Sequence, residues 1–441
     1  MDGNTPAFLT TACPPAVTSS LRRQTAPIRV AVLIDLEWSA DAGGHVKCWQ
    51  RLAEAAARSD QAVDITICAL GDREETVPLS PAVRLRTIAP LLSTRRLPLL
   101  VHVPDHTDLA PLYPRLIPWL GSFDILHTTD PCFALAASAR IASRLYGRPL
   151  TTSNHTETPA YARIFADQVL RRTFGEGWLG SLLRHRLALP QRLMTSMQRR
   201  AGKHYAHCRA ILLSARDDIT AYAHYAGAAT SILRRGIDRD RFHPSRRDRA
   251  WLRRAFGVAE HEIAILFAGR IDPGKAVMTL ARAARMLIDE GMPIKVIMAG
   301  RGSQRRKIAE LLGDRASLPG QVSQEELARL YASADLFVLP SRVEHSPNVV
   351  IEAKASGLPV IVAPGGGGTF VRQHGLDGIL VTERDPAAWA SAIRELARDR
   401  SRRAAIAAAG LADARSRFPT WDDVYGEDLL PVWRRVAARA G

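Results

Sequence analysis

Short apolar runs bounded by turn residues alternate with longer amphipathic segments along most of the chain. In the first half these runs occupy residues 28–33, 62–70, 83–88, 124–129 and 208–214, and the pattern repeats from 262 to 381. Apolar runs of this length without polar alternation are typical of parallel strands that are covered on both faces. Their alternation with helices predicts doubly wound α/β sheets, and 441 residues suit two domains of about 200 residues each.

The stretch 335–363 shows the pattern most clearly, with apolar runs at 335–339 and 358–362. Between them we expect a helix with Ser346 as its N-cap, Pro347 in the first helical position and an end near Gly357. The start of such a helix opens at the carboxyl edge of the sheet. Ligands of open α/β sheets bind at that edge, and the free N–H groups there attract phosphate. The sequence therefore predicts an anion site at residues 346–349.

Two carboxylates flank this predicted anion site. Glu344 precedes the helix, and Glu352 lies inside it. A carboxylate beside a diphosphate is suited to accept paired hydrogen bonds from the vicinal hydroxyls of a ribose or a hexose, which favours a nucleotide sugar as ligand. In the alternative interpretation Glu344 caps a loop and Glu352 is a surface residue of the helix.

Glu344, seven residues, Glu352 and the following AKASGLPV resemble the signature of the family-4 retaining glycosyltransferases. The resemblance implies that Glu344 contacts the donor sugar and Glu352 the ribose diol. It also implies that the loop and helix start, with Ser346, Asn348 and Val349, hold the diphosphate. The similarity covers roughly residues 230–400.

The run FAGRIDPGK at 267–275 is similar to the strand and phosphate loop of the same family. By this resemblance Arg270 and Lys275 clamp the diphosphate and stabilise the charge that develops on it. Gln321 and Val322 lie where the family holds the nucleotide base. The donor is then a nucleotide diphosphate sugar, and no metal or further cofactor is expected.

The resemblance also implies the GT-B fold, in which two Rossmann-like domains with doubly wound parallel sheets face a cleft. We expect a disordered tail at 1–26, an acceptor-binding domain at 27–238 and a nucleotide-sugar-binding domain at 239–418. Residues 419–441 are expected to form a helix that crosses back to the first domain.

Two features of the first half are candidates for the cleft. Gly43 and Gly44 follow the first strand, where a glycine pair lets backbone approach a ligand, although a plain turn is the alternative. His155 lies in HTETPAY, which is similar to the His-Thr-Asp segment of family members that glycosylate membrane lipids. The resemblance places His155 at the reacting sugar, and a structural histidine is the alternative.

Two positions depart from the family pattern. Arg235 stands where the family usually has Asn before Gly, which leaves the role of that position open. His345 and Ser346 replace the Gly-Phe pair that commonly follows the first Glu, so the identity of the donor sugar stays open as well.

The net charge of +16 is concentrated in residues 163–209, where ten Lys or Arg face two acids. Apolar residues are interleaved with these arginines, and Pro190 is expected to divide the segment into two helices. One interpretation is a core-facing helix pair with a solvated basic face. The other is an interfacial surface on anionic lipid, which would serve a membrane lipid or lipid-linked acceptor. A soluble sugar acceptor is the alternative.

Other classes of function fit less well. Five scattered cysteines show neither a disulfide framework nor a zinc pattern, and no apolar run reaches the 18 or so residues of a membrane span. The start MDGNTPAF lacks the basic segment of a signal peptide, so we expect a cytoplasmic protein that attaches peripherally to the inner face of the membrane. A nucleotide-sugar epimerase or phosphorylase of the same fold explains the Glu344/Glu352 pair less well. The basic segment lacks the repeated aromatics of a nucleic-acid-binding surface.

Overall fold

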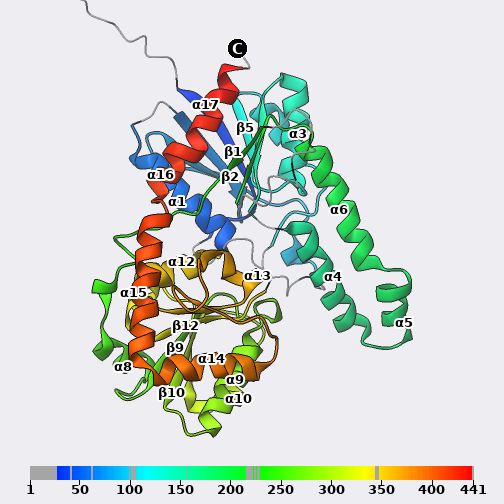
Figure 1. The fold of residues 1–441 in the computed structure, drawn as a ribbon. Helices are drawn as coiled ribbons and strands as arrows, with labels where there is room; N and C mark the ends of the chain where they lie inside the picture. Colours follow the sequence, from blue (N-terminus) through cyan, green and yellow to red (C-terminus); the bar gives the residue numbers. More distant parts are fainter. Residues whose placement is uncertain are drawn as a thin grey trace, which may run out of the picture.

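The computed structural model describes residues 27–39, 42–60, 63–98, 100, 106–155, 157–214, 222, 225, 229–342 and 347–439. It contains two α/β domains, one above the other in Figure 1, joined by linker segments and by the last helices of the chain. The expected tail at 1–26 and the candidates Glu344 and Ser346 lie outside the described residues.

The N-terminal domain is built on a sheet of eight strands in the order β3-β4-β2-β1-β5-β6-β7-β8. They are β1 (Ile28–Glu37), β2 (Val63–Leu70), β3 (Glu75–Ser80), β4 (Val83–Ile88), β5 (Ile125–Thr128), β6 (Leu150–Ser153), β7 (Ala210–Leu213) and β8 (Ala229–Ile232). All neighbours pair in parallel except β3, which is antiparallel to β4. The pattern of apolar runs did not predict β3, because this edge strand is exposed and contains Pro78.

The C-terminal domain has a sheet of six strands in the order β11-β10-β9-β12-β13-β14, and its neighbours all pair in parallel. They are β9 (Ile263–Ala268), β10 (Ile294–Ala299), β11 (Ala316–Gly320), β12 (Leu336–Leu339), β13 (Val360–Val362) and β14 (Ile379–Leu380). Strands β9, β12 and β13 are almost wholly buried, as expected for a sheet that is covered on both faces. The prediction of two parallel-sheet α/β domains is therefore confirmed.

Helices cover both sheets. The N-terminal domain has α1 (Gly44–Arg58), α2 (Leu116–Leu120) and α3 (Ala134–Tyr146). The C-terminal domain has α8 (Arg249–Phe256), α9 (Val277–Asp289), α10 (Arg305–Leu312), α11 (Gln324–Ser333), α12 (Asn348–Ala355), α13 (Pro364–Gly367), α14 (Pro386–Arg398) and α15 (Arg400–Arg417). Helix α12 is fastened to α15 by the fully buried Lys354, whose Nζ lies 2.5 Å from Asp413 and 2.7 Å from Asp377.

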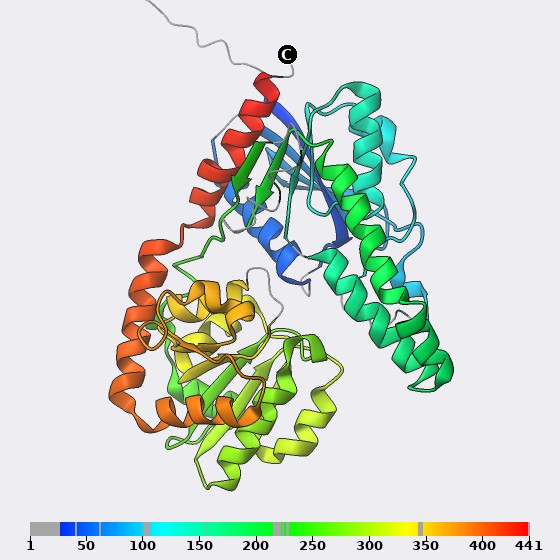
Figure 2. The same ribbon diagram turned by 45° about the vertical axis from the view of Figure 1, so that its right-hand side comes forward.

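A helical projection, here called the arm, extends from the N-terminal domain beside the gap between the domains (Figures 1 and 2). It comprises α4 (Thr158–Phe174), α5 (Trp178–Ser181), the π-helix η2 (Leu182–Arg186) and α6 (Leu189–Tyr205). The predicted break at Pro190 falls slightly earlier. The chain turns at Ala188, whose φ is 48°, and Pro190 lies in the first turn of α6, where its missing N–H needs no partner.

The last segment of the chain packs against the N-terminal domain. After α15 come α16 (Trp421–Asp423), the π-helix η7 (Val424–Leu429) and α17 (Leu430–Ala438). Trp421 and Trp433 are buried in the same apolar core as Trp49 of α1. In the described part of the chain no helix is long and apolar enough to cross a membrane.

Candidate active site between the two domains

A cavity of about 1160 Å³ lies where the carboxyl ends of both sheets and the base of the arm meet. Ten of the sequence candidates line this cavity, and they come from both domains. Asn348 and Val349 belong to α12. The other eight are Gly43, Gly44, His155, Arg270, Lys275, Gln321, Val322 and Glu352. Parallel strands end at one edge of each sheet, which explains why residues so far apart in sequence share one cavity.

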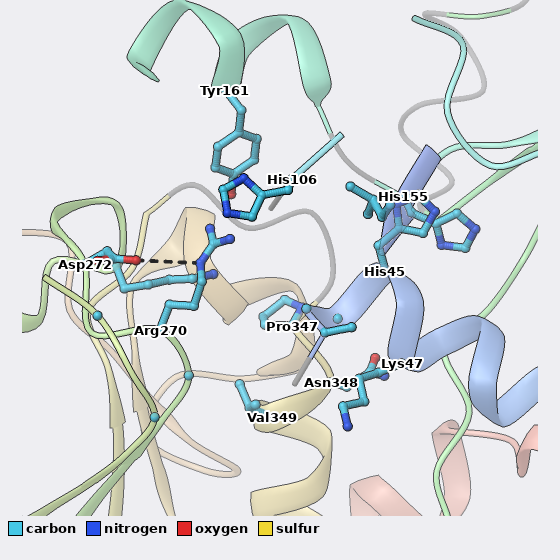
Figure 3. Close-up of a pocket in the computed structure, with 18 of the residues that line it drawn as sticks. His45, Lys47, His106, His155, Tyr161, Arg270, Asp272, Pro347, Asn348 and Val349 are labelled. Atoms are coloured by element: carbon cyan, nitrogen blue, oxygen red, sulfur yellow. Dashed lines mark ion pairs between the residues drawn. The ribbon is translucent and has the colours of Figure 1, made fainter. Parts of the chain in front are cut away.

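Arg270 and Lys275 lie in the loop between β9 and α9. Lys275 ends a short 3-10 helix (Pro273–Lys275), and the Arg270 Nε lies 4.0 Å from the Asp272 carboxylate (Figure 3). Asp272 in turn accepts hydrogen bonds from the backbone N–H and the hydroxyl of Ser303, which fixes it. The loop thus presents two cations to the cavity on a braced backbone.

Gly300 allows this loop to lie so close to the end of β10. Its φ is 154°, and a Cβ atom there would lie 1.8 Å from the carbonyl oxygen of Gly269. Any other residue would push apart the strand ends that carry Arg270.

The start of α12 faces the cavity from the same domain, as Pro347, Asn348 and Val349 show in Figure 3. The helix begins at Asn348, one residue later than predicted, with Pro347 directly before it. Its first N–H groups are therefore available to an anion, as in other helix starts that bind phosphate.

Glu352 is partly buried at the cavity wall and is not a solvated surface residue. Burial raises the pKa of its carboxyl from the ordinary 4.5 to about 7, and the nearby Tyr331 hydroxyl and the charges of Arg51 and Lys47 oppose that rise. Arg51 and Lys47 belong to α1 of the other domain. The carboxylate thus lies where both domains act on it.

This raised pKa predicts how a Glu352→Gln variant responds to pH. Between pH 4.5 and about 7 the folded protein binds a proton at Glu352 that the unfolded chain has released, so wild-type stability falls as pH rises through that window. The Glu352→Gln variant lacks this loss of stability with rising pH. We expect its melting temperature, relative to wild type, to rise from pH 5 to pH 8. A difference that stays flat with pH would contradict the pKa.

Gln321 and Val322, the candidates for the nucleotide base, differ in how exposed they are. Gln321 is exposed at the cavity rim, and Val322 packs partly against the domain core. The glycine run at 365–368 does not line the cavity. A Cβ on Gly366 would lie 1.4 Å from the carbonyl oxygen of Ser341, so this glycine serves close packing of the backbone.

His155 lies on the opposite wall, at the end of β6, and is only 6% exposed. Its ring stacks on His45 at 4.6 Å between centroids, and the two lie side by side in Figure 3. The Trp49 indole donates to His155 Nε2 at 3.1 Å, and the Ser153 hydroxyl lies 2.8 Å from the same nitrogen. Gly43 precedes α1 and Gly44 begins it, which brings the helix start next to these rings.

The resemblance places His155 at the reacting sugar, where a positioned imidazole contributes about a hundredfold, so we expect His155→Ala to lower turnover by about that factor. Donor affinity should change little, since the residues that the sequence predicts for the donor belong to the other domain. Steady-state kinetics separate the two effects, with exposed His261→Ala as the control. Unchanged turnover would make His155 a structural residue.

Sequence reasoning missed two acids on this wall. Asp35 ends the buried part of β1, and Asp130 follows β5. Both are buried and line the cavity; burial raises the pKa of Asp35 well above its usual range and that of Asp130 to about 6. Their position after apolar strands was the available signal, because strand ends of parallel sheets face the ligand.

Residues 262–399 match the protein family described as glycosyl transferases group 1. A D-inositol 3-phosphate glycosyltransferase from Geodermatophilus obscurus is 40% identical over 179 residues, which cover 37% of this chain and only 39% of that protein. The protein of the same name from Streptomyces scabiei is 29% identical over 436 residues, covering 91% of this chain and 90% of the relative. Similarity is thus strongest in part of the chain and weaker over its whole length.

Solved structures share the fold at low sequence identity. Sucrose-phosphate synthase from Thermosynechococcus elongatus superposes with a TM-score of 0.68 at 19% identity, covering 93% of this chain and all of that one. HepE of Anabaena in complex with UDP-glucose gives a TM-score of 0.60 at 19% identity, covering 93% and 99%.

These neighbours show that the predicted GT-B fold is correct. The chain is thus similar to group 1 glycosyltransferases over residues 262–399 and, at lower identity, to a named glycosyltransferase along most of its length.

Proposed function

We propose that this chain is a retaining glycosyltransferase of family 4 that moves a sugar from a nucleotide diphosphate sugar to an acceptor held by the N-terminal domain. One observation carries the proposal. Arg270, Lys275, Glu352 and the start of α12 line one wall of a cavity, and His155 lies on the opposite wall. Cations and a helix start suit a diphosphate, and a carboxylate beside them suits a sugar diol.

In the proposed reaction the bond between the anomeric carbon and the β-phosphate oxygen breaks. An acceptor hydroxyl forms a bond to that carbon on the same face, and its proton passes to the departing diphosphate. Arg270, Lys275 and the helix start stabilise the negative charge that grows on the leaving group, which lowers the barrier. Glu352 holds the nucleotide ribose, and His155 contacts the sugar. Glu344 is proposed to contact the donor sugar as well.

A UDP-sugar is the first donor to test, because HepE of Anabaena, which shares the fold, was solved with UDP-glucose. We propose Gln321 and Val322 for the nucleotide base, since both lie at the cavity rim of the C-terminal domain.

For the acceptor we propose a membrane lipid or lipid-linked molecule, because the cavity continues along the arm between α4 and α6. Its lining there is apolar and follows one face of each helix, with Phe165 and Val169 on α4 and Leu193 and Met197 on α6. An apolar groove that opens into the sugar site fits a molecule with a polar head and a hydrocarbon chain.

The far end of the arm is suited to a bilayer surface. Trp178 is 79% exposed there, and Phe174 and Leu179 are exposed beside it. Arg172, near the end of α4, and Arg186, at the end of η2, are also exposed. Exposed apolar side chains edged by arginines are typical of segments that lie at an anionic membrane interface.

One arginine that the sequence suggested for this surface is not part of it. The side chain of Arg184 is 2% exposed and pairs with Asp167 at 2.8 Å and with Glu176 at 2.9 Å. Arg171 pairs with the same two acids. This four-residue cluster joins α4 to η2. It contains both acids of residues 163–209, so the other eight basic residues of that segment have no acid within the segment to pair with.

A soluble phosphorylated acceptor is the second candidate. The relatives from Geodermatophilus obscurus and Streptomyces scabiei are named for D-inositol 3-phosphate, which has no hydrocarbon chain. A soluble acceptor would occupy the polar part of the cavity near His155 and leave the arm groove unused.

Product analysis tests the reaction type. With an α-linked UDP-sugar we expect an α-linked product by NMR and undiminished turnover in a chelator, because cationic side chains hold the diphosphate. A β-linked product would contradict the retaining assignment, and loss of activity in the chelator would contradict the assigned role of the cations. Free epimerised nucleotide sugar without transfer would identify an epimerase of the same fold.

A further inference from the structure

Arg235 is a buried arginine at the cavity wall that pairs with no acid in the part of the chain that the structure describes. It follows β8, is 7% exposed and lines the cavity. Among the described residues it forms no ion pair, and its Nε has no hydrogen-bond partner. Its polar contacts include the His155 ring, whose Nδ1 lies 3.4 Å from Nη1, and the Cys48 thiol.

The His155 ring is a poor acceptor for this guanidinium. The Trp49 indole can only donate, and its 3.1 Å contact makes His155 Nε2 the acceptor. In a neutral imidazole the other nitrogen then carries the proton, so Nδ1 meets Arg235 as one donor facing another. The longer 3.4 Å separation agrees with a contact that is not a true hydrogen bond.

A guanidinium has five N–H donors and stays charged, so burying it without an acceptor is costly. Folded proteins retain such a group when a ligand supplies the missing charge. The planar fork of arginine matches phosphate and carboxylate in particular, since both can accept two parallel hydrogen bonds.

The location of Arg235 assigns this missing anion to the acceptor side. The residue contacts His155, and its neighbour Gly236 packs so tightly against Trp421 that a Cβ would lie 2.6 Å from the indole. His155 belongs to the N-terminal domain and Trp421 to the last segment of the chain, which packs against that domain, whereas Arg270 and Lys275 approach from the C-terminal domain.

We propose that Arg235 binds an anionic group of the acceptor, of the phosphate class, at a site separate from the donor diphosphate site. The proposal rests on the proposed function, because it assigns the N-terminal wall to the acceptor. Arg235 then fixes the acceptor next to His155 by a bidentate contact.

Calorimetric titration of the full chain with inorganic phosphate, with and without saturating UDP, tests whether Arg235 forms this anion-binding site. We expect wild type to bind phosphate when UDP is present, Arg235→Gln to bind it at least about tenfold more weakly, and Arg235→Lys to lie between them. Arg144→Gln, an exposed position on α3, should match wild type. Glycerol 3-phosphate and dihexanoyl phosphatidic acid separate the sources: tighter binding of the second indicates a lipid headgroup, and equal binding a soluble phosphorylated acceptor.

The melting temperature without ligand provides a second readout. Arg235→Gln removes an uncompensated buried charge, so we expect it to melt at or above the wild-type temperature, whereas loss of a structural arginine would lower it. A lowered melting temperature, unchanged phosphate binding, or phosphate binding that UDP abolishes would each overturn the proposal. Absence of sugar transfer with intact, Arg235-dependent phosphate binding would instead contradict the proposed function alone.

Discussion

Replacing Lys275 or Arg270 by alanine is expected to lower sugar transfer about a hundredfold. A charge-assisted contact to a leaving group that gains negative charge contributes roughly 3 kcal/mol, which corresponds to that factor. Both cations line the cavity from one braced loop, so each loss leaves part of the developing charge uncompensated. The effect should appear in turnover as well as in donor affinity, because the charge is greatest in the transition state.

The measurement is the initial rate of transfer with a UDP-sugar that wild type accepts. Arg253→Ala is the matched control, because this residue is exposed on α8 of the same domain and does not line the cavity. If both clamp variants kept rates close to wild type while binding donor normally, the assignment of the donor site would be wrong.

Reversing Arg172, Arg186 and Arg192 to glutamate is expected to abolish binding to anionic vesicles. Each basic residue near such a surface is worth roughly 1 kcal/mol, so loss of three lowers the affinity by more than a hundredfold, and the new carboxylates add repulsion. The three arginines are exposed around the end of the arm that carries Trp178. Arg184 must be left intact, because its reversal would break a buried ion-pair cluster.

Vesicle co-sedimentation at low salt measures this binding. Wild type should pellet with anionic but not with neutral vesicles, and salt should release it. Reversal of Arg253, Arg254 and Lys307, exposed on the C-terminal domain, changes the charge equally and should preserve binding. If wild type ignores anionic vesicles, the lipid acceptor is wrong and the soluble acceptor becomes the better proposal.

The apolar strands of this fold could be predicted because their burial leaves an uninterrupted run of large hydrophobic residues. The antiparallel strand β3 could not, since one exposed polar edge strand looks like a loop in the sequence. The interval between Glu344 and Glu352 led to the predicted donor side by resemblance, and of the two acids the structure describes Glu352, which lies on α12 and lines the cavity.

The cavity wall of the N-terminal domain was harder to predict because it is assembled from segments that lie far apart in the sequence. Arg235 differs from the residue that the family usually has at its position, and only the structure places it beside His155. The count of basic residues at 163–209 could not separate Arg184, which is buried among carboxylates, from Arg186, which is exposed. Pairing of charges depends on how α4 and η2 pack, which composition does not record.

Thermal unfolding of the full chain with a panel of nucleotide sugars tests the central claim, a nucleotide-sugar site built from Arg270, Lys275 and α12. A ligand at 100 times its dissociation constant adds roughly 2.7 kcal/mol of stability. We predict that at least one nucleotide diphosphate sugar raises the melting temperature of wild type, and that the Arg270→Ala/Lys275→Ala double variant loses this shift. A panel of UDP-, GDP-, ADP- and TDP-sugars that leaves wild type unchanged, or a shift that the double variant retains in full, would contradict the site.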